Sequence, residues 1–328
     1  MKDSFYIFQS GELKRKDNTI LLITSRGEKK TIPVNKVVSL HIFGEVAFNK
    51  KFLEFINKHG ILLHFYNYEY DVYCGTFYPR TRNTSGYLRV KQVEHYLDQR
   101  KRMYIASAIV DGATYNMLRV ISRYTQDAEP KKMFKELKNL RSSLRKANDV
   151  DELMGYEGNI RKKYYQALAL AFNMEYEGRI KRPPKGELNA LISFGNTLLY
   201  AETLNRLYET QLDPSISYLH EPMEQRFSLC LDIAEIFKPI IVDRVISTLI
   251  GKKMLKPNDF DKDLDATYLS ESGRRKFVEQ FRKRLSDTIQ HPTLKRSVSY
   301  RTLIQLECYK LIKHLVNIRP YSALKVWW

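Results

Sequence analysis

Three residues in one short stretch of the chain, Tyr218 to Pro239, carry side chains that bind divalent metal ions. His220 is followed by two carboxylates, Asp232 and Glu235, which are three residues apart. Residues three apart lie on the same face of a helix. An imidazole and one or two carboxylates that converge on one point would bind a divalent metal ion.

The spacing limits how the chain can run between the histidine and the second acid. A single helix from Pro222 to Glu235 would rise roughly 20 Å, at about 1.5 Å per residue. His220 could then not share a metal ion with Glu235, so a shared site requires the chain to turn. We therefore predict that His220 to Phe227 forms a connecting turn.

A helix is predicted to follow, from Ser228 to Phe237. Ser228 stands ahead of an apolar run and is a suitable N-cap, and Pro239 would end this helix or begin the next one. The alternative is a half-buried helix with two solvated acids and an unrelated histidine nearby. The spacing alone leaves both interpretations open.

A third carboxylate, Glu157, lies in a helical segment between Gly155 and Gly158. Each glycine costs a helix interior up to about 1 kcal/mol, and such glycines often let another helix or a ligand approach the backbone. Three basic residues follow within two turns: Arg161, Lys162 and Lys163. The segment could place a metal ligand beside a phosphate-binding stripe. Taken alone, it fits a tightly packed helix crossing with a solvated basic face better.

A later helical segment has small residues at its centre. Ser193 and Gly195 weaken the helix where another element could press against it, and Asn189 could cap the helix or cross-link through its amide. A contact between helices is preferred here over a ligand site.

The composition favours a polyanionic partner. The chain has 55 Lys and Arg against 37 Asp and Glu, a net charge of +18. A surplus of that size is typical of nucleic-acid binding, although a merely basic protein would have the same balance. The candidates for DNA contacts are Arg161, Lys162, Lys163, Lys181, Arg182, Lys185, Arg274, Arg275 and Lys276. They are candidates as a group, because charge runs are usually solvated faces.

The cysteines and the hydropathy indicate the compartment. Cys74, Cys230 and Cys308 are scattered, which argues against a zinc ribbon or a disulfide framework and fits a reducing cytoplasm. No apolar run approaches the roughly 20 residues of a membrane helix, and the first residues lack a signal-peptide core. We expect a cytoplasmic protein with no membrane segment.

The chain is predicted to have an α+β fold with two domains. Residues 4–78 have the pattern of short strands, with one helix from Asn49 to His59. Pro79 to Gly86 is the predicted linker, and helical segments dominate beyond it. We predict a small β-rich N-terminal domain, residues 1–85, suited to dimerisation, and a larger all-helical catalytic domain, residues 86–328. The end of the chain, with Trp327 and Trp328, is predicted to be loosely ordered rather than a docking tail.

Together these stretches resemble the Cas1 family of CRISPR-associated integrases. The motifs, in chain order, are Met154-Gly-Tyr-Glu-Gly158, Arg182-Pro-Pro184, Asn189-Ala-Leu-Ile-Ser-Phe-Gly195, His220, Asp232-Ile-Ala-Glu235 and Phe237-Lys-Pro239. The N-terminal half is similar in Phe43-Gly-Glu45 and Gly75-Thr-Phe-Tyr-Pro79. The resemblance therefore covers nearly the full chain.

The resemblance implies a site, a cofactor and partners. Its three metal ligands correspond to Glu157, His220 and, by position, Glu235, and one imidazole with carboxylates suits Mg²⁺ or Mn²⁺. The third ligand is Asp in some members, and the neighbouring Asp232 could act through a second metal ion or an outer-shell bond. The resemblance also implies a homodimer that binds double-stranded DNA and joins a smaller partner, Cas2.

The implied reaction inserts spacer DNA into a CRISPR array. The 3′-hydroxyl of a short duplex would attack a phosphodiester at the edge of a repeat, with the metal ion lowering the pKa of the hydroxyl. With water as nucleophile, the same site would cut DNA. Two alternatives stay open: a stand-alone metal-dependent nuclease, and a non-catalytic DNA-binding scaffold.

Overall fold

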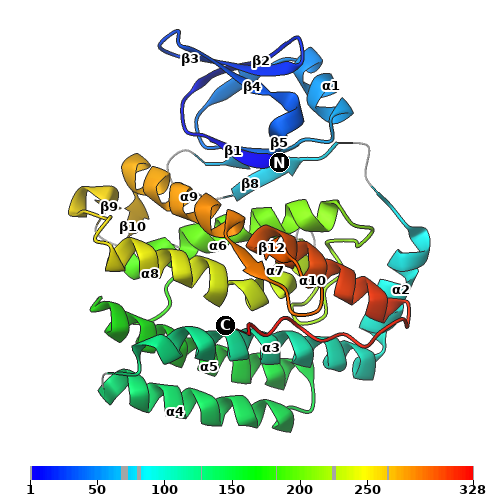
Figure 1. Ribbon diagram of the computed structural model, residues 1–328, viewed down its shortest axis with the longest axis vertical. Coiled ribbons are helices and arrows are strands. Elements are labelled where there is room, and N and C mark those ends of the chain that lie inside the picture. Colours follow the sequence, from blue (N-terminus) through cyan, green and yellow to red (C-terminus); the bar gives the residue numbers. More distant parts are fainter. Residues whose placement is uncertain are drawn as a thin grey trace. The chain divides into compact units, whose positions relative to one another are not determined.

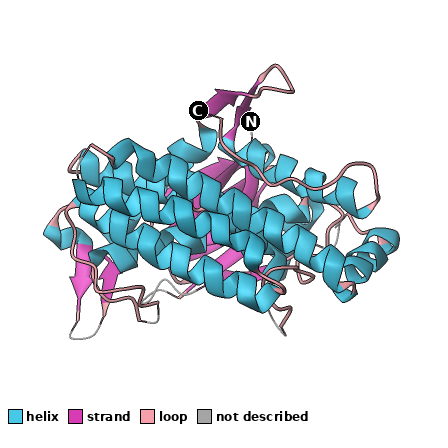
Figure 2. Cartoon of the chain, turned by 90° about the horizontal axis from the view of Figure 1, so that it is seen from below, coloured by secondary structure: helices cyan, strands magenta, loops and turns pink. Residues whose placement is uncertain are grey.

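The computed structural model describes residues 2–67, 73–79, 83–126, 128–181, 183–223, 227–263 and 266–327. The chain divides into two compact units, Met1–Asn83 and Thr84–Trp328, and each is described by itself. Most of their elements are labelled in Figure 1, and Figure 2 separates helices from strands by colour.

The described part of the smaller unit contains two four-stranded sheets and a helix. Its elements are β1 (Asp3–Ile7), β2 (Gly11–Lys16), β3 (Thr19–Thr24), β4 (Lys29–Pro33), β5 (Val37–Ile42), β6 (Val46–Phe48), α1 (Lys50–Lys58), β7 (Leu62–Tyr66) and β8 (Tyr73–Phe77). One sheet has the order β1-β5-β7-β8, and the other has the order β4-β3-β2-β6. In the first sheet β1, β5 and β7 are parallel, and β8 is antiparallel to β7.

Alternating apolar residues build the core of this unit. Ile20 and Leu22 on β3 point to one side and are buried with Leu13 and Phe52. The Asn49 side chain accepts a hydrogen bond from the backbone N–H of Phe52 at 3.0 Å and so caps α1. The helix predicted from Asn49 to His59 is therefore confirmed.

The larger unit is mainly helical. Its helices are α2 (Gly86–Leu97), α3 (Gln99–Ile121), α4 (Ala128–Ser143), α5 (Val150–Phe172), α6 (Glu187–Tyr208), α7 (Ser228–Phe237), α8 (Arg244–Gly251), α9 (Glu271–Ser286) and α10 (Tyr300–Leu315). Two short strand pairs, β9 (Phe260–Lys262) with β10 (Thr267–Leu269) and β11 (Thr288–Gln290) with β12 (Ser297–Ser299), were not predicted. In the part of the chain that the structure describes, no helix is long and apolar enough to cross a membrane.

Helix α6 is the central helix of the larger unit. It is apolar on most sides and nearly all of its residues are buried, as expected for a helix surrounded by others. A Cβ atom at Gly195 would lie 2.5 Å from Cγ1 of Val242 and 2.7 Å from Cζ of Phe277. The predicted contact through small residues is confirmed, because two other elements press on this glycine.

Helix α7 follows the predicted bounds but not the predicted cap. The residue at the N-cap is Phe227, and Ser228 is the first helical residue. The Ser228 hydroxyl is buried and donates to the Ser215 carbonyl at 2.9 Å, so it cannot cap the helix. Pro239 opens a π-helical turn, Pro239–Asp243, that leads directly into α8.

The C-terminal segment is docked rather than loosely ordered, so the prediction for it was wrong. Tyr321 is 1% exposed and its hydroxyl donates to Oε1 of Glu307 at 2.7 Å. The Trp327 indole donates to the Gln290 carbonyl at 3.2 Å, and Trp328 lies outside the described residues. The segment runs along α3 and α10 (Figure 1).

Candidate active site

Helices α5 and α7 bring two of the predicted carboxylates to one guanidinium group. Glu157 and Arg161 lie one turn apart on α5, and Nε of Arg161 is 2.5 Å from Oε1 of Glu157. Nη2 of the same arginine contacts both Glu157 and Glu235, which comes from α7. Two acids that are 78 residues apart in the sequence therefore share one cation.

The α5 helix is open beside Glu157. It runs without a break through Gly155 and Gly158, and Asp149 caps its start by accepting from the Glu152 N–H at 2.8 Å. A Cβ atom at either glycine would meet no described atom within 4 Å. The predicted tight helix crossing is therefore wrong at these glycines.

Glu235 is a buried carboxylate between two cations. Its Oε1 atom lies 2.6 Å from Nζ of Lys238, and its Oε2 atom contacts Arg161. Burial favours the protonated acid, but the two cations outweigh it and lower the pKa of Glu235 to about 2. Glu235 is therefore ionised at neutral pH.

Asp232 holds the loop that carries His220. Its carboxylate is fully buried and accepts the backbone N–H groups of Tyr218, Leu219 and His220 at 2.7 to 3.0 Å. Nδ1 of His220 lies 2.8 Å from Oδ1 of Asp232. Since an ionised carboxylate only accepts, Nδ1 carries a proton, and in the neutral ring Nε2 then carries the lone pair. Nε2 is 4.0 Å from Oε1 of Glu235, so the chain reverses between these two residues as predicted, although residues 224–226 of the predicted turn lie outside the described residues.

The donor set fits a hard divalent ion. Glu157 and Glu235 offer carboxylate oxygens, and His220 offers an imidazole nitrogen whose tautomer Asp232 fixes, which suits Mg²⁺ or Mn²⁺. Among the described residues no three His, Cys, Asp or Glu side chains already converge as a metal site. Arg161 lies between the two glutamates and contacts both. The Asp232 oxygens are taken by four donors, which favours an outer-shell role.

Two basic residues that the sequence did not single out adjoin this cluster. Arg179 donates to Oδ1 of Asn189 at 3.0 Å and to Oγ of Ser193 at 2.9 Å, which are neutral acceptors. Burial lowers the pKa of Arg179. Lys238 forms the ion pair with Glu235. No spacing in the sequence points to Arg179. The three-residue spacing of Glu235 and Lys238, by contrast, could have indicated their ion pair.

The predicted basic residues near the cluster differ in their surroundings. Lys162 and Lys185 are exposed, whereas Lys163 pairs with Glu136 at 2.6 Å. Desolvation and then the charges of Lys238, Arg179 and Arg161 lower the pKa of Lys181, so it stands in a field of excess positive charge. Arg182 lies outside the described residues.

The three basic residues on α9 do not form an open stripe. Arg274 is 8% exposed, which leaves little of its side chain for a DNA contact. Arg275 pairs with Glu271 one turn before it, and Lys276 lies 2.6 Å from the buried Asp259. Arg275 and Lys276 therefore form ion pairs with acids of the same unit.

A buried acid lies behind the cluster. Asp243 is 1% exposed, and its Oδ2 atom accepts from the Tyr164 hydroxyl at 2.8 Å. Its Oδ1 atom has no hydrogen-bond partner among the described residues. Burial raises the pKa of Asp243 to about 7.

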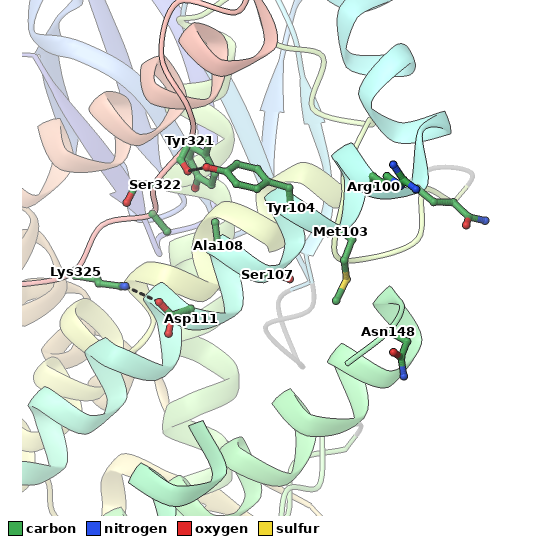
Figure 3. Close-up of a pocket in the computed structure, with 12 residues that line it drawn as sticks. Arg100, Met103, Tyr104, Ser107, Ala108, Asp111, Asn148, Tyr321, Ser322 and Lys325 are labelled. Atoms are coloured by element: carbon green, nitrogen blue, oxygen red, sulfur yellow. Dashed lines mark hydrogen bonds and ion pairs between the residues drawn. The ribbon is translucent and has the colours of Figure 1, made fainter. Parts of the chain in front are cut away.

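A groove on this unit is lined by other residues. It has a volume of about 730 Å³ and runs between α3, Asn148 and the C-terminal segment. Figure 3 shows Tyr104 and Tyr321 along it, and the ion pair of Asp111 with Lys325 at 2.5 Å. None of the three candidate metal ligands lines this groove.

Comparisons with known proteins find relatives over nearly the full chain. Residues 5–283 match the family model of CRISPR associated protein Cas1. The chain is 48% identical over 328 residues to CRISPR-associated endonuclease Cas1 3 of Thermodesulfovibrio yellowstonii, with 99% of each chain covered. It superposes on the Cas1 protein TM1797 of Thermotoga maritima with a TM-score of 0.88 and 42% identity, over 98% and 99% of the two chains. A casposase bound to an integration product has the same fold, with a TM-score of 0.84 and 18% identity over 98% of this chain and 93% of that one.

Proposed function

The chain belongs to the Cas1 family of CRISPR-associated proteins, and we propose on that premise that it is a metal-dependent DNA endonuclease and integrase. It would insert spacer DNA into a CRISPR array by attack of a 3′-hydroxyl on a phosphodiester. The observation that carries this proposal is the convergence of Glu157 and Glu235 on one cation, with Nε2 of His220 4.0 Å from Glu235.

The residues of the site divide into metal ligands and positioning groups. The proposed metal ligands are Glu157, His220 and Glu235. A bound Mg²⁺ or Mn²⁺ would lower the pKa of the attacking hydroxyl and neutralise charge on the phosphate. Asp232 fixes the tautomer of His220 and the loop that carries it. Lys238 holds the carboxylate of Glu235 in its ionised form.

The charge around the carboxylates fits a phosphodiester substrate. Arg161, Arg179, Lys181 and Lys238 are electrostatic neighbours, and the acids that face them are Glu157, Glu235 and the buried Asp243. The excess of cations would attract the DNA backbone. The exposed Lys162 and Lys185 are proposed as further phosphate contacts, and Arg182 stays a candidate from the sequence.

The proposed partners are double-stranded DNA, a second copy of the chain and Cas2. The first unit, Met1–Asn83, is proposed as the dimerisation domain and the second as the catalytic domain. The proposed place of action is the cytoplasm, where the array DNA is found.

Strand transfer in vitro tests the proposal. Purified protein, Cas2, a short duplex with free 3′-hydroxyls, a repeat-bearing plasmid and Mn²⁺ would be combined, with Glu157→Ala, His220→Ala and Glu235→Ala beside the wild type. The exposed Glu279→Ala on α9 is the matched control. We expect joined product from the wild type and the control, and none from the three variants.

The same assay separates the alternatives. A stand-alone nuclease would cut DNA without Cas2 and give no joined product. A non-catalytic scaffold would stay fully functional with Glu157→Ala or His220→Ala. If the three variants join DNA like the wild type, the residues are structural and the proposal is wrong.

A further inference from the structure

Arg161 differs from the other cations of the site because it contacts two carboxylates. Its guanidinium contacts both Glu157 and Glu235, whose side chains are only 17% and 6% exposed. Two carboxylates shielded from water repel each other unless a cation lies between them. Arg161 lies between the two carboxylates and therefore offsets the repulsion between them when no metal ion is bound.

The neighbouring Lys238 has a different role. It pairs with Glu235 alone, through Oε1 at 2.6 Å, and leaves the Oε2 atom to Arg161. Arg161 is the only cation in the described part of the chain that forms ion pairs with both glutamates. A divalent ion bound by the same two acids would supply the charge that Arg161 supplies now.

We propose that Arg161 is an internal counterion that a divalent metal ion must displace from Glu157 and Glu235. Its presence lowers the affinity of the site for metal and keeps the carboxylates together until metal arrives. The inference rests on the proposed metal site, and adds a residue that sets the affinity of that site.

Displacement would also give the guanidinium a new partner. Arginine binds phosphate through a planar set of donors that matches two phosphate oxygens. Arg161 lies one turn from Glu157, on the helix whose surface is open at Gly155 and Gly158. Metal entry would therefore release a phosphate-binding group at the point where DNA can approach the helix.

Direct titration with Mn²⁺ tests this, with free Mn²⁺ measured by electron paramagnetic resonance on the full-length protein without DNA. Arg161→Gln removes the charge and Arg161→Lys keeps it. Arg141→Gln is the matched control, because Arg141 pairs with Asp111 on another part of the same unit at 2.7 Å. Glu157→Gln tests the metal site itself.

We expect Arg161→Gln to bind Mn²⁺ about tenfold more tightly than the wild type, equivalent to about 1.4 kcal/mol. Arg161→Lys and Arg141→Gln should stay close to the wild-type affinity. Unchanged or weaker binding by Arg161→Gln would overturn the inference. If Glu157→Gln binds Mn²⁺ like the wild type, the proposed metal site fails as well. If Glu157→Gln loses binding while Arg161→Gln gains none, only the inference fails.

A second measurement uses the wild type, in case Arg161→Gln does not fold without metal. The arginine Nε–H signal of Arg161, assigned by its loss in Arg161→Lys, would be followed by NMR during titration with diamagnetic Mg²⁺. We expect its chemical shift to move to the value of a solvent-exposed guanidinium, with the same midpoint as metal binding. A signal that keeps its position at saturating Mg²⁺ would show that Arg161 stays on Glu157, and would overturn the inference.

Discussion

Nδ1 of His220 lies 2.8 Å from Oδ1 of Asp232, and the same carboxylate accepts three backbone N–H groups of the loop that carries the histidine. One buried acid thus fixes both the path of the loop and the tautomer of the ring. A histidine on an unsupported loop would lose entropy when it binds metal, whereas this one is already oriented.

The first prediction concerns Asp232→Asn. The amide can accept through one oxygen only, and its NH₂ group faces donors, so buried N–H groups lose their acceptor. We expect a loss of roughly 2 to 4 kcal/mol in the free energy of unfolding and a weakened affinity for Mn²⁺. Urea denaturation and Mn²⁺ titration measure the two effects. Asp261→Asn, at an exposed position on β9, should change neither. Wild-type metal affinity in Asp232→Asn would show that the acid does not position His220.

The second prediction compares glycines in two helices. Gly195→Ala on α6 would bring a Cβ atom within 2.5 Å of Val242, so overpacking should cost about 1 to 3 kcal/mol of unfolding free energy. Gly155→Ala and Gly158→Ala on α5 meet open space, and each should raise that free energy by up to about 1 kcal/mol through helix propensity. Equal effects in the two helices would contradict this difference in packing.

The α5 glycines also allow a test of function. If DNA approaches the helix there, the alanine variants should bind DNA more weakly although they are more stable. Fluorescence anisotropy with a labelled duplex measures this, at one stated salt concentration because phosphate contacts depend on salt. Unchanged DNA affinity in both variants would place the DNA elsewhere.

Local patterns predicted some parts of the molecule well. The apolar run and Pro239 gave the bounds of α7 correctly, although the N-cap predicted at Ser228 was wrong. The three-residue strands of β9 to β12 are too short to show any period. Arg161 was predicted to belong to a phosphate-binding stripe, although its spacing from Glu157 is that of an ion pair on one helix face.

Long-range contacts account for most of what the sequence did not predict. The partnership of Glu157 and Glu235 followed from the family resemblance, because no local spacing connects residues on two helices. The sequence of the C-terminal segment shows neither helical nor strand periodicity. Its order depends on contacts with residues of α3 and α10, which no local pattern in the segment reveals.

The third prediction concerns pH and Asp243. Its pKa is about 7 in the folded protein against an ordinary value of 3.8, so between these values the folded chain holds a proton that the unfolded chain has lost. Stability from this group is complete below about pH 4 and is lost as the pH rises toward 7. Glu235, with a pKa of about 2, acts in the opposite sense and only as the pH falls below about 4.5.

Asp243→Asn should remove this dependence and keep the hydrogen bond from Tyr164. We expect the variant to gain stability over the wild type as the pH rises from about 4 to about 7, by on the order of 1.4 kcal/mol for each pH unit at most. Unfolding free energies across that range measure the difference. Parallel curves for the two proteins would show that Asp243 is ionised in the fold throughout.

The last prediction concerns Asn116, which ties the C-terminal segment to the helix that carries two of the site's acids. Its side chain is fully buried on α3 and donates to the carbonyls of Ile236 at 2.9 Å and Leu324 at 3.0 Å. It also accepts from the N–H of Val326 at 3.0 Å. Ile236 directly follows Glu235, so a single amide connects the end of the chain to the candidate metal site.

Asn116→Ala removes these three buried hydrogen bonds, and should cost roughly 2 to 4 kcal/mol of unfolding free energy. Lys325→Ala breaks the neighbouring ion pair with Asp111, drawn in Figure 3, but that pair is partly exposed and its loss should cost less than about 1 kcal/mol. Asn139→Ala, at an exposed position on α4, is the control. If the amide also positions α7, Asn116→Ala should weaken Mn²⁺ binding while Lys325→Ala does not. A destabilised Asn116→Ala that keeps wild-type Mn²⁺ affinity would mean that the segment stabilises the unit without positioning Glu235.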